Sequence, residues 1–430
     1  MVSGAASQDC LSPSLRVASA SLSAMPWIRR NQPTTILHMV TVATLLILIG
    51  ISTAAAQSWF QTSAPAENWY SIASSGDGKK LVAVAQGGLT NQGGFFEVLP
   101  GPVYISTNAG LSWSQSAAPS YVWQSVASSF DGRRLIAGTF FGPICISTNS
   151  GLTWSEVTNL SNDGWWGNVA ISADGVTMAA AASGGGIAVS TNGGTSWEPS
   201  TVPNDQDWDC LAISADATKM IAGSIDGFVY FSINRGTTWT QASLPNIIWG
   251  GVAVSSNGVM VAAVKNAVPT SSGPIYISTN SGGNWTQSSA PIATWQPVVI
   301  SSDGTRIVAA NEDGQIYTSP DLGATWIQNT APTMGWSYLA VSADGAAAVA
   351  VVDGGGIYTL GLGISFNGGD VHLFWPSNSL NFRLQESMDL SKPSWMRITN
   401  VPTFDGTTLQ YEVSLPSTNA KHFYRVLSAN

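Results

Sequence analysis

Residues 106–113 read STNAGLSW, and the same eight-residue pattern, Ser-x-Asn/Asp-x-Gly-x-Ser/Thr/Asn-Trp, occurs six times in the chain. Its copies end at Trp113, Trp154, Trp197, Trp239, Trp285 and Trp326, which places successive copies 41 to 46 residues apart. A nearly constant spacing in this range is typical of propellers, solenoids and arrays. Each repeat is therefore expected to form one supersecondary unit.

A second pattern alternates with the first and consists of a Trp, a short apolar stretch and a turn of the Asp-Gly type. It begins at seven positions: Trp69, Trp123, Trp166, Trp208, Trp249, Trp295 and Trp336. Between the two patterns lie a further apolar run and an alternating run, as in residues 81–85 and 103–105. Each unit thus contains four short strands separated by turn residues. Four-stranded units repeated radially are propeller blades, so the sequence predicts an all-β, seven-bladed β-propeller over residues 57–362.

The eight-residue pattern has a physical reason to form a turn. In the copy at 106–113 the Asn108 side chain can accept hydrogen bonds from amides of its own loop, Gly110 can adopt a positive φ cheaply, and Trp113 covers the turn. The same three positions are assigned a structural role in every copy: Asn108, Gly110, Trp113, Asn149, Gly151, Trp154, Asn192, Gly194, Trp197, Asn234, Gly236, Trp239, Asn280, Gly282, Trp285, Asp321, Gly323 and Trp326.

These turns resemble the Asp-box, or BNR, repeat of sialidases and other propeller families. The resemblance covers roughly residues 57–362 and implies the fold, not an activity. A single seven-bladed ring behind a signal peptide looks most like the photosystem II assembly and stability factor family, although the arginine-rich face of those proteins is missing here. The similarity implies a binding role and leaves the ligand open.

Sialidase chemistry is not expected, because the resemblance would require three arginines that clamp a substrate carboxylate. Within the predicted ring the only arginines are Arg133, Arg134, Arg235 and Arg306. All four follow Asp-Gly turns or lie inside an eight-residue turn, so they belong to one edge of the blades.

The seventh unit lacks the eight-residue turn, because residues 357–359 run directly into the sequence LGL. Residues 58–65, SWFQTSAP, instead read like the segment that follows the turn in other units, such as residues 284–291, NWTQSSAP. We therefore expect the N-terminal strand to complete the last blade, which removes an open sheet edge.

The first 56 residues have the pattern of a leader. Arg29 and Arg30 precede an apolar run, residues 39–51, and then the sequence TAAAQ. A basic flank, a short apolar core and an Ala-x-Ala end predict a signal peptide cleaved after Ala56, with an uncleaved anchor as the alternative. The run is shorter than the about 20 residues of a membrane span. The protein is accordingly expected to be a monomer, secreted or held in the envelope of a bacterium, with no transmembrane span after cleavage.

Composition and charge exclude several classes of function. The chain is 44% apolar and 10% charged with a net charge of −9, and it contains no Lys/Arg cluster, so a nucleic-acid partner is not expected. Cys145 and Cys210 fall in strands of the second and fourth blades, too far apart for a disulfide, and are expected to be buried free thiols. The histidines, His38, His372 and His422, all lie outside the ring. No metal, cofactor or catalytic residue is expected.

A different pattern begins after residue 362. Five segments, residues 371–375, 381–387, 395–398, 409–413 and 422–426, read as strands. They suit a small β-sandwich over residues 363–430, which resembles the C-terminal module of many secreted bacterial proteins. That resemblance implies surface attachment, sorting or a binding appendage.

Strand order predicts where a ligand binds. The loops between the second and third strands, and those between blades, share one end of the ring, here called face one; the Asp-Gly turns and the eight-residue turns share the other, face two. The variable loops all lie on face one, where binding usually resides. They supply the candidate ligand-binding residues Trp165, Asp163, Asp205, Asp207, Asp209, Tyr121, Phe95, Phe96 and Glu97.

Three interpretations of function follow. The first is an exported, non-catalytic propeller that binds a polysaccharide or a protein through face one. The second is a glycoside hydrolase that uses paired carboxylates of face one as acid and base. The third is a structural envelope protein. The seven repeated Trp residues could stack on a sugar, but a residue present in every blade is better explained by packing between blades.

Overall fold

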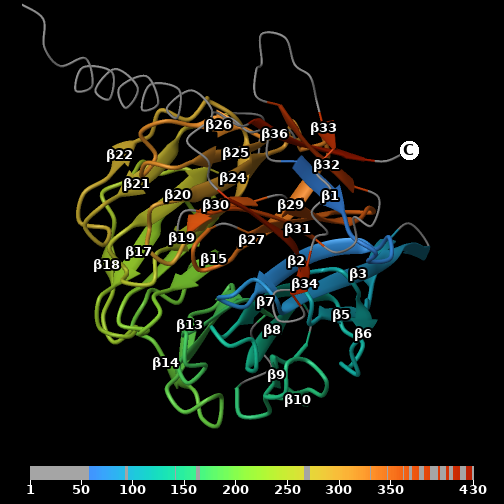
Figure 1. The fold of residues 1–430 in the computed structure, drawn as a ribbon. Coiled ribbons are helices and arrows are strands. Elements are labelled where there is room, and N and C mark those ends of the chain that lie inside the picture. Colours follow the sequence, from blue (N-terminus) through green and yellow to red (C-terminus); the bar gives the residue numbers. More distant parts are fainter. Residues whose placement is uncertain are drawn as a thin grey trace, which may run out of the picture. The chain divides into compact units, whose positions relative to one another are not determined.

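The computed structural model describes residues 58–428, except 93–94, 141, 161–164, 266–271, 330, 346, 362, 368–369, 377–381, 388–395, 398–402, 406–409 and 417–422. Every regular element in these residues is a β-strand. Figure 1 shows seven antiparallel sheets arranged around a centre as the blades of a propeller. The predicted all-β, seven-bladed fold is confirmed.

Each blade contains four strands, the first of which is innermost. The first blade consists of β2 (Asn68–Ser74), β3 (Leu81–Gln92), β5 (Val103–Ser106) and β6 (Ser114–Gln115), with β4 (Phe95–Leu99) paired to β3. The second to sixth blades follow in sequence order: β7 (Trp123–Ser128), β8 (Leu135–Thr139), β9 (Cys145–Ser147) and β10 (Ser155–Glu156); β11 (Trp165–Ile171), β12 (Met178–Ser183), β13 (Ile187–Ser190) and β14 (Glu198–Pro199); β15 (Trp208–Ile213), β16 (Met220–Ser224), β17 (Val229–Ser232) and β18 (Thr240–Gln241); β19 (Trp249–Val254), β20 (Val261–Lys265), β21 (Ile275–Ser278) and β22 (Thr286–Gln287); β23 (Trp295–Ile300), β24 (Ile307–Asn311), β25 (Ile316–Ser319) and β26 (Ile327–Gln328).

The seventh blade is completed by the N-terminal strand. Its strands are β27 (Trp336–Val341), β28 (Ala348–Val352), β29 (Ile357–Gly361) and β1 (Ser58–Gln61). Strand β1 pairs antiparallel with β29, and Trp59 packs against Trp336 with ring centroids 6.0 Å apart. The predicted closure of the ring by the N-terminal strand is confirmed.

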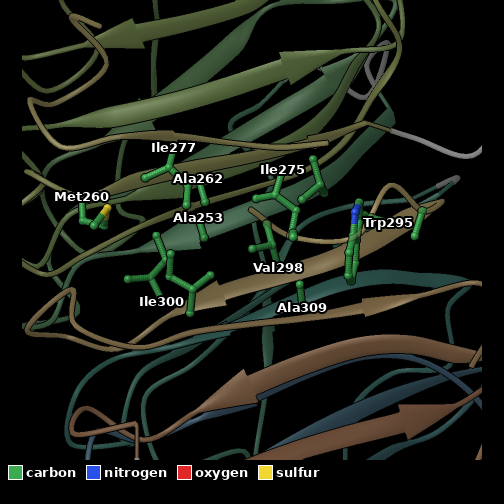
Figure 2. Close-up of a cluster of buried hydrophobic side chains, with 13 residues drawn as sticks. Ala253, Met260, Ala262, Ile275, Ile277, Trp295, Val298, Ile300 and Ala309 are labelled. Atoms are coloured by element: carbon green, nitrogen blue, oxygen red, sulfur yellow. The ribbon is translucent and has the colours of Figure 1, made fainter. Parts of the chain in front are cut away.

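Apolar side chains fill all seven boundaries between blades. Seven clusters of buried residues occur, and each combines residues of two neighbouring blades. Figure 2 shows the cluster between the fifth and sixth blades, where Ile275 of β21 lies near Val298 and Trp295 of β23. The blades are therefore held together by side-chain packing in addition to the chain itself.

The repeated Trp residues belong to these clusters. Six of the seven are at most 3% exposed: Trp69, Trp123, Trp208, Trp249, Trp295 and Trp336. Burial of one Trp side chain contributes about 4–6 kcal/mol as an upper bound. In five blades the Trp meets the edge of a third-strand Tyr, such as Tyr104 beside Trp69, at centroid distances of 5.3–5.7 Å. The interpretation of these Trp residues as packing between blades is supported.

The eight-residue turns contain hydrogen bonds between their own residues. In the first copy the backbone N–H of Ser112 donates to Asn108 Oδ1 over 2.9 Å, and the N–H of Gly110 donates to Ser106 Oγ over 2.9 Å. Gly110 has a φ of 85°. The Trp113 indole N–H donates to the Gly110 carbonyl over 3.1 Å. The equivalent indole bond forms at Trp154, Trp239 and Trp285, whereas the indole N–H groups of Trp197 and Trp326 are buried without a partner among the described residues.

A closed ring of backbone hydrogen bonds surrounds the axis at face two. One residue in each Asp-Gly-type turn donates its N–H to the carbonyl of the equivalent residue in the next blade, over 2.7–3.0 Å. The members, in order, are Gly76, Phe130, Ala173, Ala215, Ser256, Ser302 and Ala343, and Ala343 donates back to Gly76. All seven innermost strands line an axial cavity of about 160 Å³ beside this ring.

The strands after the propeller form two further sheets. One contains β30 (Gly363–Asn367), β31 (Asp370–Pro376), β35 (Gln410–Pro416) and β34 (Thr403–Asp405), and the other contains β33 (Met396–Arg397), β32 (Phe382–Ser387) and β36 (Phe423–Ser428). Each of the five segments predicted as a strand contains one. The packing of the two sheets into a sandwich stays a prediction.

Candidate binding face

Three cationic side chains of face two contact neighbouring blades. Lys80 and Lys219 donate from Nζ to turn carbonyls of the next blade, each over 2.9 Å, and Arg306 Nη1 donates to the Gly345 carbonyl over 3.2 Å. All three occupy the same position after the Asp-Gly-type turn. Where the seventh blade has Ala347 at this position, a cavity of about 50 Å³ lies at the boundary with the first blade.

We expect the Lys219→Ala variant to lose about 1 kcal/mol of unfolding free energy, because the bond to the Asn257 carbonyl and the packing of the alkyl chain both disappear. The midpoint of chemical denaturation measures this loss. Arg133→Ala is the matched control, since Arg133 is exposed and donates no side-chain hydrogen bond to the described residues. Equal losses in the two variants would contradict a role for Lys219 between blades.

The positions of the arginines do not suit sialidase chemistry. Arg133, Arg134 and Arg306 follow turns between the first and second strands of their blades, and Arg235 lies in an eight-residue turn. All four therefore belong to face two, and Arg306 is engaged between blades. No group of arginines lines face one among the residues that the structure describes.

Acidic side chains gather on face one around the start of β15. Asp207 Oδ1 accepts a hydrogen bond from Ser183 Oγ over 3.0 Å, and the Asp207 N–H donates to Asp226 Oδ2 over 2.8 Å. Asp205 is exposed and accepts a bond from Gln206 Nε2 over 3.1 Å. The structure thus brings the predicted Asp205 and Asp207 together with Asp226, which sequence reasoning did not identify.

Trp165 forms an aromatic patch beside this acidic group. Its side chain is 45% exposed, and its ring lies 5.4 Å from that of Phe140, which belongs to the loop after β8. Asp163, the other candidate on this loop, lies outside the described residues. Phe95, Phe96 and Glu97 lie on β4, which extends the loop of the first blade on face one, but their side chains are outside the described part of the chain.

Tyr121 has a role in packing. In the second blade Cys145 occupies the third-strand position that carries Tyr in five other blades. Tyr121 supplies the missing ring from the preceding loop and meets Trp123 edge-on, with centroids 5.7 Å apart. Its hydroxyl donates to Glu156 Oε1 over 2.7 Å, and this bond together with burial raises the pKa of Tyr121 to about 12. Its predicted role in ligand binding stays a prediction.

Asp209 differs from the other acidic residues because it lies in the innermost strand of the fourth blade. It occupies a β-bulge between Trp208 and Cys210. Burial raises its pKa, and no cation contributes to the shift. No hydrogen bond from the described residues reaches its carboxylate. Asp209 is thus a carboxylate held in a poorly solvated place without a counter-charge.

Two tyrosines of the innermost strands are influenced by the charge of Asp209. Tyr70 lies at the equivalent bulge of the first blade, and Tyr338 lies beside the bulge of the seventh. Burial, followed by the charges of Asp209 and Asp353, raises the pKa of Tyr70. Burial, followed by the nearby Cys210 and Asp209, raises the pKa of Tyr338 to about 12. Their side chains are 42% and 39% exposed, respectively, although both residues lie in innermost strands of the ring.

Sequence reasoning missed Tyr70 and Tyr338, although a signal existed. The residue after the repeated Trp varies among the blades: Tyr70, Gln124, Gly167, Asp209, Gly250, Gln296 and Ser337. Tyr338 is one residue further along in the seventh blade. A variable position inside an otherwise repeated pattern gives the blades different side chains at equivalent places around the axis. Only the ring geometry shows that residues from the first, fourth and seventh blades meet there.

The described residues hold no group of three or more His, Cys, Asp or Glu side chains that could bind a metal ion. Cys145 and Cys210 are both buried and free, as predicted, and burial raises the pKa of each thiol. Within the described part of the chain no helix is long and apolar enough to span a membrane.

Comparisons with known proteins identify the fold. No protein-family model matches the chain, and no curated protein matches it. Solved structures do match: "YCF48 bound to D1 peptide" (TM-score 0.55, 14% identity, covering 71% of this chain and 96% of that one) and YCF48 from Cyanidioschyzon merolae (0.54, 16%, 71% and 98%). The β-propeller domain of Cps50 (Swd1) from Myceliophteria thermophila also matches (0.54, 11%, 71% and 99%). At these identities the likeness shows the fold alone, that of a seven-bladed β-propeller.

Proposed function

We propose that this protein is a non-catalytic binding scaffold that holds a partner protein on face one. The observation that carries this proposal is the separation of charge between the two faces. Of the eight Lys and Arg residues between 58 and 361, seven belong to face two: Lys79, Lys80, Arg133, Arg134, Lys219, Arg235 and Arg306; only Lys265 belongs to face one.

The acidic residues have a different distribution. Described acidic residues of face one are Glu67, Asp205, Asp207, Asp209, Asp226, Glu312, Asp313 and Asp353. Most acidic side chains of face two accept hydrogen bonds from residues of their own turns. Asp303, for example, accepts hydrogen bonds from Ser301 and Thr305, and these bonds lower its pKa. Face one therefore presents a negative field that attracts and orients a basic partner.

The structural neighbours support a protein as the partner. One matching propeller is a YCF48 bound to a peptide, which shows that this architecture can present a peptide-binding surface. The arginine-rich face implied by the resemblance to the photosystem II assembly factors is absent here. We therefore propose a partner of opposite charge, a segment rich in Lys or Arg.

A polysaccharide is the second candidate ligand. The exposed Trp165, supported by Phe140, offers a ring face of the kind on which a sugar stacks. A hydrolase would need two carboxylates at a defined separation. Asp209, whose pKa is raised, has no carboxylate among the causes of its shift.

We also propose the finer features indicated by the sequence. The six eight-residue turns are Asp-boxes, a signal peptide ending at Ala56 exports the chain as a monomer, and the C-terminal strands form a sandwich used for attachment or sorting. The hydrogen bonds of the turns support the first of these proposals.

Parallel peptide and polysaccharide arrays test the function. We expect the purified protein to bind basic peptides and to lose most of this binding in an Asp205→Asn, Asp207→Asn double variant. Arg133→Ala, which changes charge on face two, is the control and should bind normally. Binding to polysaccharide that is lost in Trp165→Ala would favour the second candidate. Release of sugar products would establish a hydrolase, and no binding on either array would contradict the proposal.

A further inference from the structure

We infer that the innermost strands form an axial channel at face one, which takes up one Lys or Arg side chain of the bound protein between Asp209, Tyr70 and Tyr338. This inference rests on the proposed function of face one and names the contact that would give that face its specificity. The three residues come from the fourth, first and seventh blades. They therefore meet only across the axis of the ring.

The placement of the three side chains follows from the blade geometry. Each innermost strand has a sheet neighbour on one side only, and the faces of each blade are covered by adjacent blades. Tyr70 is 42% exposed between the buried Trp69 and Ser71 of β2, so its free surface faces the axis. The charge of Asp209 acts on both Tyr70 and Tyr338, which places the three groups within electrostatic reach of one another.

The charge of Asp209 lacks compensation within the protein. Its carboxylate accepts no hydrogen bond from a described residue, and no described cation lowers its pKa. A desolvated carboxylate without a partner destabilises the folded state. A residue that is unfavourable for folding, at the centre of a face proposed for binding, is expected to serve a ligand.

The chemistry of the three groups selects an organic cation. A carboxylate supplies the counter-charge, and two phenol rings supply electron-rich faces and hydroxyl acceptors for an ammonium or guanidinium group. Among the described residues, no group of three or more His, Cys, Asp or Glu side chains that could hold a metal ion occurs here. A Lys or Arg side chain is long enough to place its charge in the channel while its backbone stays on the acidic surface of face one.

The stability of Asp209→Asn gives a test that does not depend on the ligand. An Asp whose pKa is raised in the folded state favours folding when protonated, so the wild type loses stability as the pH rises from about 3.9 through the raised value. Asn imitates the neutral form. We expect the variant to melt a few degrees above the wild type at pH 7, and the two melting curves to converge at low pH. A variant that melts lower at pH 7 would contradict the uncompensated charge.

Binding is tested by NMR titration with capped pentapeptides, Gly-Ser-X-Ser-Gly, in which X is Lys, Arg, acetyl-lysine or norleucine. We expect Lys and Arg peptides to bind and the two neutral peptides to bind at least about tenfold more weakly. Asp209→Asn should weaken binding of the Lys peptide about tenfold. Tyr338→Phe, which keeps the ring face, should weaken it less than Tyr338→Leu.

The matched control is Asp313→Asn, which removes the same charge from an exposed position of face one that is not among the candidate binding residues. A loss confined to Asp209→Asn supports the channel. Equal losses of affinity in both variants would mean that the overall negative charge of face one attracts the peptide. This result would contradict the channel but not the proposed function. A Lys peptide that binds no better than its acetyl-lysine form also contradicts the channel. If the Lys peptide shows no preference and neither the peptide array nor the polysaccharide array shows binding, both the channel and the proposed function are contradicted.

Discussion

Removal of residues 57–65 should lower the melting temperature by about 10 °C or more. Strand β1 pairs with β29 along its whole length, and Trp59, 6% exposed, packs in the cluster between the sixth and seventh blades. Loss of one buried Trp alone costs about 3–5 kcal/mol. For a domain of this size each kcal/mol corresponds to about 2–4 °C. The deletion also exposes the edge of β29, so the variant should aggregate more readily on heating.

Trp59→Ala in the full chain separates packing from strand pairing. We expect it to reproduce a large part of the loss, measured by calorimetry. Trp165→Ala is the control, because Trp165 is 45% exposed and its removal leaves no comparable cavity. A deletion variant that melts at the wild-type temperature would show that the ring does not need β1.

Gly138→Ala is expected to cost about 1–3 kcal/mol, although it adds only one methyl group. Gly138 is in β8, and a Cβ atom there would lie 2.4 Å from the Gly167 carbonyl oxygen and 2.6 Å from that of Trp166. Both oxygens are backbone atoms of the third blade, so neither can rotate away. The second and third blades would have to separate to admit the methyl group.

The Gly335→Ala variant is the matched control for this effect. A Cβ atom at Gly335 would have no neighbour within 4 Å, so the substitution should change the free energy of unfolding little. Urea denaturation of both variants measures the difference. Equal midpoints would mean that the second and third blades can adjust to the added group at no cost.

The sequence predicts the ring well because its determinants are local and repeated. A turn such as residues 106–113 contains its own acceptors and its own positive-φ glycine, so its structure does not depend on distant residues. Closure by residues 58–61 could be predicted for the same reason, since that segment matches the outer strands elsewhere. Repetition gives independent copies of one pattern, and each copy supports the same fold.

The candidate site could be predicted only in part, because it depends on contacts across the ring. Asp209 was identified by its loop, whereas Tyr70 and Tyr338 lie 139 residues before and 129 residues after it. Nothing local marks them as neighbours. The role of Tyr121 was equally hidden, because it depends on Cys145 having replaced the Tyr that packs against Trp in other blades.

The axial ring of hydrogen bonds has a mechanical consequence for the binding face. Strand β1 belongs to the seventh blade, and residues 62–67 lead directly from it to β2 of the first blade, so these two blades are joined at two radii. The bond from Ala343 to Gly76 fastens them at the axis, and the pairing of β1 with β29 fastens them at the rim. Because these two contacts lie at different distances from the axis, they fix both the separation and the relative angle of the first and seventh blades. Tyr70 and Tyr338, which belong to these two blades, thus keep a constant gap, and a side chain that enters between them meets an opening of preset width.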